Sequence, residues 1–211
     1  SKKYNAILIA GKINIATYEQ FIDAYNILDK NKDIYLILWS TGGESILSGK
    51  ICDIILNHKG NGKFIACVPR YALSAACKIA LCCDKIYASP HALFSPCDTQ
   101  INVDVVTGLH PISDVIDIVK NKKDKNEAIA EYWLAAELSA HRSNTRYKKF
   151  IKSLCEIRKY DEQKLNEELF RGKYSHNDNF TAQEINNMDF GLQIIITDKI
   201  TVNNIKKLNS L

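Results

Sequence analysis

Short apolar runs alternate with longer amphipathic stretches in the first third of the chain. A run that is apolar at every position is typical of a strand buried on both faces of a parallel sheet. We expect such strands at residues 5–10, 34–39 and 63–68. Between them, apolar positions at helical spacing predict one helix from a Thr17 cap to about Asp29 and a second from about Glu44 to His58. This alternation indicates an α/β fold with right-handed crossovers.

A stretch rich in alanine, cysteine and leucine follows the third strand, at residues 74–83. Its composition predicts a helix that is buried on most sides and that begins at or near Ser74. Lys78 is the polar exception in this stretch. One turn beyond Ser74, its ammonium can approach the Ser74 hydroxyl, but a stem that extends outward to water is the more common arrangement.

Helical patterns dominate the second half of the chain. Thr181 and Glu184 form the Thr-x-x-Glu pattern of a capping box, which predicts a helix that ends at Met188. The other elements expected here are short strands at 85–88 and 92–95, a loop at 102–111, a charged helical arm at about 114–170 and a last strand at 194–197.

Composition narrows the classes of protein. A chain of 211 residues that is 46% hydrophobic can bury one sizeable core, so we expect a single domain over residues 1–211. The net charge is only +4 and lysines are interspersed with acidic residues, which argues against nucleic-acid binding. The seven cysteines show no C-x-x-C pair and no metal-ligand spacing. We therefore expect reduced cysteines, a cytoplasmic location and neither a metal nor a cofactor.

Apolar runs in this chain all fall short of the ~18 residues that a membrane-spanning helix needs. The chain also begins without a methionine. Membrane attachment is therefore expected only through a segment outside these residues.

The candidate chemistry centres on Ser74 and on the diglycine turn Gly42-Gly43, which directly follows an apolar strand. A serine at a helix start is most often a cap. A serine that faces the backbone N–H groups of a glycine turn instead has the two parts that acyl transfer requires, a nucleophile and an oxyanion site.

Three ordered strings make a family resemblance specific: LILWSTGGESILSGKICDIILNHKG, VPRYALSAACKIALCCDKIYASPHALFSPCDTQ and LFRGKYSHNDNFTAQEINNMDFGL. Together they resemble the serine dehydrogenase proteinase family, a relative of Clp protease and signal peptide peptidase A in the ClpP/crotonase superfamily. The resemblance implies an α/β superhelix of ββα units with a C-terminal helical arm. It also implies a serine endopeptidase that acts on polypeptide and assembles as a homo-oligomer.

Carried over by position, the resemblance makes Ser74 the nucleophile that forms an acyl-enzyme, with Asp98 and His176 completing the triad. The oxyanion N–H groups would come from Ala75 and from Gly43 or Gly42. Ser95 lies about where Clp proteases place their histidine, which argues against a Clp-type triad.

Departures from the family pattern leave alternatives open. Ala76-Cys77 replaces the usual glycine and small polar residue after Ser-Ala, and Asp117 and Tyr132 stand where related helices often carry lysines. His110 is the main rival of His176 as the base, and a Ser74–Lys78 dyad is a further possibility. A catalytically inactive oligomeric scaffold with the same fold is the alternative from a different functional class, and acyl-CoA chemistry has only the diglycine in its favour.

Overall fold

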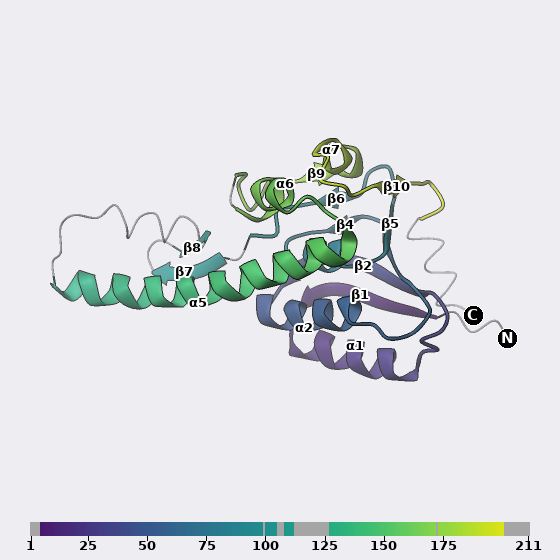
Figure 1. The fold of residues 1–211 in the computed structure, drawn as a ribbon, viewed down its shortest axis with the longest axis horizontal. Coiled ribbons are helices and arrows are strands. Elements are labelled where there is room, and N and C mark those ends of the chain that lie inside the picture. The colour runs from purple at the N-terminus through teal and green to yellow at the C-terminus, as the bar shows by residue number, and fades with distance from the viewer. Residues whose placement is uncertain (1–4, 99, 105–107, 112–126, 172, 201–211) are drawn as a thin grey trace. The chain divides into compact units, whose positions relative to one another are not determined.

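The structure is a computed structural model that describes residues 5–98, 100–104, 108–111, 127–171 and 173–200, without the side chains of residues 101–142 (Figure 1). The chain divides into two compact units. The first comprises Ser1–Cys97 and His176–Leu211, and the second comprises Asp98–Ser175. Each unit is described by itself.

A sheet forms the centre of the first unit, with eight strands among the described residues. These strands are β1 (Ala6–Ile13), β2 (Ile34–Gly43), β3 (Phe64–Val68), β4 (Tyr71–Ala72), β5 (Lys85–Ala88), β6 (Leu93–Phe94), β9 (Phe180–Thr181) and β10 (Ile194–Ile196). They lie in the order β10-β5-β3-β2-β4-β6-β9, and β1 also pairs with β2. All pairs are parallel except β6–β9. The α/β fold expected from the apolar runs is confirmed.

Strand β2 is shared by two halves of this sheet. Residues 34–37 pair with β3, as predicted, whereas Ser40 pairs with Ala72 of β4. The alternate residues Leu36, Leu38 and Ser40 are fully buried. Because side chains alternate across a strand, these three residues share one face of β2.

Helices cover the sheet and hold the site. They are α1 (Ile15–Ile27), α2 (Ser45–Leu56), α3 (Ala75–Leu81) and α7 (Ala182–Asn187). Helices α1 and α2 lie side by side, α1 also packs on β1, and α3 packs against both α2 and β2 (Figure 1). The capping box predicted for Thr181 and Glu184 is confirmed at the start of α7.

The predicted cap of α1 is wrong. Asn14, not Thr17, occupies the N-cap, and its Oδ1 accepts a hydrogen bond from the Thr17 N–H at 3.0 Å. The Thr17 hydroxyl instead donates to the Lys12 carbonyl at 2.9 Å. Asparagine caps a helix at least as well as threonine, so the helix begins at the earlier residue.

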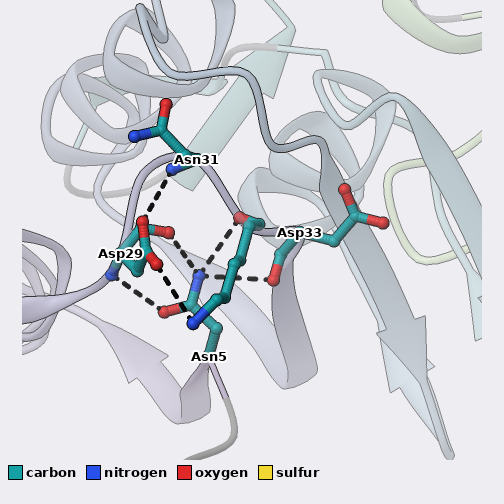
Figure 2. Close-up of polar contacts among 5 residues, drawn as sticks. Asn5, Asp29, Asn31 and Asp33 are labelled. Carbon is teal, nitrogen blue, oxygen red and sulfur yellow. Dashed lines mark hydrogen bonds and ion pairs between the residues drawn. The ribbon is translucent and has the colours of Figure 1, made fainter.

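Asn5 ties the start of β1 to the loop between α1 and β2 (Figure 2). Its amide nitrogen donates to the carbonyls of Asp29, Lys32 and Asp33 at 2.8, 3.2 and 3.3 Å, and its Oδ1 accepts the Asp29 N–H at 3.1 Å. The Asn31 N–H donates to Asp29 Oδ1 and lowers the pKa of that carboxyl, with help from Lys32. Side-chain to backbone hydrogen bonds therefore hold this loop just before β1 and β2 begin to pair with each other.

The second unit contains the antiparallel strands β7 (Gln100–Asp104) and β8 (Gly108–Pro111). The loop predicted at 102–111 is therefore wrong. Gly108 and Pro111 are residue types that commonly interrupt a strand and so favour a loop, but each stands at an end of β8, where a strand tolerates them.

Helix α5 (Glu127–Arg158) dominates the second unit with 32 residues, and α6 (Glu162–Leu165) and the π-helical segment η1 (Asn166–Phe170) follow it. The Tyr147 hydroxyl donates to the Phe170 carbonyl at 2.9 Å and ties α5 to η1. The sequence suggests Trp133 and Leu138 of α5 as contacts with another subunit, but both lie outside the described side chains. Of the helices in the described part of the chain, none has the length and apolar character needed to cross a membrane.

Candidate active site

Ser74 is the N-cap residue of α3, as predicted, but it does not act as a cap. Its side chain makes no capping hydrogen bond, and its backbone has φ 49° and ψ −118°. A positive φ is rare for a residue other than glycine, costs on the order of 1–3 kcal/mol and persists only where the surrounding structure enforces it. Such strain is characteristic of functional sites. The hydroxyl is left available for another role.

Gly42 packs directly against this serine. A Cβ atom built on Gly42 would lie 2.8 Å from the Leu73 carbonyl oxygen and 3.0 Å from both the Ala75 nitrogen and the Ser74 Cβ. Gly42 also has φ 92°, a conformation that side chains rarely adopt. Only glycine fits here. The diglycine meets the start of α3, as the sequence predicted, but Gly42 and Gly43 are the last two residues of β2 and pair with β1, so they do not form a separate turn.

Buried serines hold the backbone on both sides of this contact. Ser95 Oγ accepts the Ser74 N–H at 2.7 Å, and Ser40 Oγ accepts the Gly42 N–H at 3.0 Å. The Ser40 carbonyl accepts the Leu73 N–H at 3.0 Å. The hydrogen bond between Ser95 and Ser74 has no local signal in the sequence, because the two residues lie 21 positions apart in the chain.

Sheet register brings the His176 turn to the same edge of the sheet as Ser74. Ser40, Ala72, Phe94 and Phe180 are consecutive partners across β2, β4, β6 and β9. Past this row the chain runs on from Ser40 to Gly42, from β4 to Ser74 and from β6 to Ser95. Strand β9 is antiparallel to β6, so the chain enters β9 from this same edge of the sheet. The partly buried His176 lies in a turn four residues before Phe180.

Lys78 does not extend outward as expected. Its side chain is only 6% exposed, and its Nζ donates to the Ser45 carbonyl oxygen at the start of α2, at 3.2 Å. Helix α3 packs against both α2 and β2, and this packing buries the Lys78 side chain.

Cys82 is fully buried at the end of α3. Burial raises the pKa of its thiol well above the ordinary value, the neighbouring Cys52 thiol raises it further, and Lys78 acts in the opposite direction. Cys82 therefore remains a protonated thiol and is a poor nucleophile.

The aspartate and the remaining histidines considered as catalytic groups lie in different parts of the structure. Asp98 and His110 belong to the second unit, where the Asp98 carboxylate is buried and accepts a hydrogen bond from Gln100, and His110 lies opposite Ile101 in β8. In the first unit, His58 bridges the Tyr25 hydroxyl and the Lys30 carbonyl, whereas His91 is exposed in a turn. No group of three or more potential metal ligands is found among the described residues.

The largely parallel sheet, the strained serine and the diglycine at the end of β2 are the features expected of a ClpP-like serine proteinase fold. A sequence model of this class, described as ClpP-like SDH-type serine proteinase, matches residues 3–205. The chain belongs to the ClpP-like SDH-type serine proteinase family. The resemblance inferred from the three motifs is thereby confirmed.

Solved structures agree with this fold. A serine-to-alanine variant of the 1510-N membrane-bound stomatin-specific protease is 17% identical, with a TM-score of 0.62 over 96% of this chain and 82% of that chain. A lysine-to-alanine variant of the same protease, in complex with a substrate peptide, is 19% identical, with a TM-score of 0.60 over 97% and 80%. At this identity the likeness supports the fold alone. No curated protein sequence matches this chain closely enough to count as a relative.

Proposed function

We propose that this protein is a serine endopeptidase that hydrolyses polypeptides through an acyl-enzyme formed on Ser74. The observation that carries the proposal is the conformation of Ser74. It stands at the start of α3 with a positive φ and no capping hydrogen bond, and Gly42 packs against its Cβ. The hydroxyl of a serine held in this way does not cap the helix and can attack a substrate carbonyl.

The oxyanion site is assigned to the backbone N–H groups of Gly43 and Ala75. Ala75 is the first residue of α3, so its N–H has no partner within the helix. Its nitrogen is also within 3.0 Å of the position that a Gly42 Cβ would take. The Glu44 N–H donates to the Ile13 carbonyl at 2.9 Å, and we expect the preceding Gly43 N–H to be directed away from β1. The Gly42 N–H already donates to Ser40, so Gly42 contributes through its lack of a side chain.

His176 is proposed as the general base and Asp98 as the carboxylate that orients it. A neutral imidazole must take the proton of Ser74, because a serine hydroxyl at its free pKa is a weak nucleophile. The position of the His176 turn at the sheet edge of Ser74 supports this role. The assignment of Asp98 rests on the motif resemblance of Pro-Cys-Asp-Thr-Gln.

A fluorophosphonate probe tests the nucleophile directly. We expect stoichiometric labelling of the wild-type protein on the peptide that contains Ser74, and a loss of labelling and peptide hydrolysis of about 10³-fold or more in Ser74→Ala. His176→Ala should lose as much, and Asp98→Asn should keep a small residual activity. His91→Ala is the matched control, because His91 is exposed in a turn, and it should retain wild-type activity.

Two other outcomes are distinguishable. Wild-type activity in His176→Ala together with its loss in Lys78→Met would favour a Ser74–Lys78 dyad, for which the burial of Lys78 beside the start of α2 is the supporting observation. A wild-type protein that neither reacts with the probe nor cleaves peptides would be a scaffold of the same fold.

A further inference from the structure

Ser74 needs external contacts to keep its backbone conformation. Its φ of 49° lies where a side chain is unfavourable, and its own hydroxyl does not cap α3. The backbone on either side is held by regular structure. The preceding Leu73 N–H donates to the Ser40 carbonyl at 3.0 Å, and the Ser74 carbonyl accepts the Lys78 N–H at 3.1 Å. The Ser74 N–H is the group between these two contacts.

Ser95 binds that N–H at the short distance of 2.7 Å. Its side chain is itself fixed, since the residue is only 2% exposed and its hydroxyl donates to the Pro96 carbonyl at 3.3 Å. A hydroxyl has one proton to donate. With that proton directed to Pro96, the Ser95 oxygen faces Ser74 as an acceptor.

We propose that Ser95 is a positioning residue, whose hydroxyl oxygen holds the Ser74 backbone in the positive-φ conformation that presents its Oγ for reaction. The inference rests on the proposed function of Ser74 as the nucleophile. It also explains why the Ser74 N–H takes no part in the oxyanion site, because that N–H is already bound. Loss of the acceptor lets the serine relax to an ordinary N-cap conformation, in which the hydroxyl turns to its own helix.

Two substitutions remove the acceptor in different ways. Ser95→Ala deletes the hydroxyl, whereas Ser95→Cys keeps nearly the same size and replaces it with a weak acceptor, so that packing is retained if the alanine variant folds poorly. Ser95→Thr keeps the hydroxyl and tests rescue. Ser89→Ala is the matched control, because the Ser89 hydroxyl also donates to a proline carbonyl, that of Pro69 at 2.8 Å, but Ser89 lies before β6 whereas Ser95 follows it.

The measured quantities are the fluorophosphonate labelling rate, kcat and KM for a peptide, and hydrogen exchange of the Ser74 amide. In Ser95→Cys and Ser95→Ala we expect labelling and kcat to fall about 10- to 100-fold with KM within about twofold, as for a displaced reacting group. The Ser74 amide should exchange at least about tenfold faster, because it loses its acceptor. Ser95→Thr and Ser89→Ala should stay close to wild type.

Failure of the inference is separable from failure of the proposed function. A wild-type protein that is labelled on Ser74, with unchanged labelling in Ser95→Cys, overturns the role of Ser95 alone. Equal losses in Ser95→Thr and Ser95→Ala also overturn it, as does a fall in melting temperature and activity that Ser89→Ala reproduces. A wild-type protein without any labelling overturns the function of Ser74 and the role of Ser95 together.

Discussion

At the scale of single residues, Gly42 sets how closely β2 and the start of α3 approach each other. Three atoms of Ala75 and the two residues before it occupy the space that a side chain would need: the Leu73 oxygen, the Ser74 Cβ and the Ala75 nitrogen. The positive φ of Gly42 adds a second constraint, since the conformation itself disfavours a side chain. Close approach and backbone conformation thus require glycine independently.

Gly42→Ala should destabilise the protein and reduce labelling of Ser74. We expect a loss of about 1–3 kcal/mol in the free energy of unfolding, from strain and from displacement of the Ser74 backbone. Gly49→Ala is the control, because Gly49 lies within α2 with open space around it, and it should stabilise by about 0.5–1 kcal/mol. Urea denaturation and probe labelling of both variants check this, and equal effects would contradict it.

Burial lowers the reactivity of cysteine thiols in this protein, because it raises the pKa of Cys67, Cys82 and Cys155. All seven are free thiols, as predicted. Burial raises the pKa of the Cys67 thiol to about 11. Since the thiolate is the reactive form, the rate of Cys67 alkylation should rise about tenfold per pH unit from pH 7 to about pH 10. The alkylation rate of N-acetylcysteine should level off near pH 9, and a plateau of Cys67 at the same pH, measured by mass spectrometry, would contradict the expectation.

At the scale of elements, the local caps decide where helices begin. Thr181 and Glu184 form both halves of a capping box at α7, and Asn14 caps α1. Strand β9 ends at Thr181, so the cap of α7 also fixes the strand that carries the His176 turn to the sheet. The capping box of α7 is thereby linked to the candidate site through β9.

Thr181→Ala should lower the free energy of unfolding by about 1 kcal/mol, as removal of an N-cap does. The Thr181 N–H, followed by the Thr181 hydroxyl, lowers the pKa of the Glu184 carboxyl. A lowered folded-state pKa contributes stability above the unfolded pKa of about 4.3, and this is lost as the pH falls through the folded value. The difference between wild type and Thr181→Ala should therefore shrink below about pH 4 in chemical denaturation. A difference that grows on acidification would be inconsistent with this linkage.

At the scale of the whole molecule, the second unit is unusual in its long helix. Helix α5 has 32 residues, nearly three times the length of an average helix in a globular protein. We expect part of this long, amphipathic helix to pack on another subunit, as in a homo-oligomer.

Self-association should be visible in solution. We expect light scattering coupled to size exclusion to give a mass that is a multiple of that of the single chain. Leu138→Lys, in the middle of α5, should reduce that mass, and Arg146→Glu, at an exposed position of the same helix, is the control for a change of charge alone. A monomer at all concentrations of the wild-type protein would rule out this assembly.

The sequence by itself determined the elements whose signals are local. Continuous apolar runs predicted β2 and β3, because a parallel sheet buries both faces of a strand and therefore requires apolar residues at every position. The helix start at Ser74 and the capping box at Thr181 were also predictable, since each depends on residues within one turn. The diglycine after an apolar strand also pointed to the contact between Gly42 and Ser74.

Only the tertiary structure decided the contacts between distant segments. Lys78 is buried because α2 lies beside α3. Strands β7 and β8 pair although β8 begins with a glycine and ends with a proline. Ser95 reaches the Ser74 N–H because β4 and β6 are neighbours. The order of strands in a sheet follows from the competition among all possible pairings of the chain, and no single segment encodes it. The proposed nucleophile could thus be named from its own motif, whereas Ser95, the residue proposed to position it, could be found only from the order of the strands.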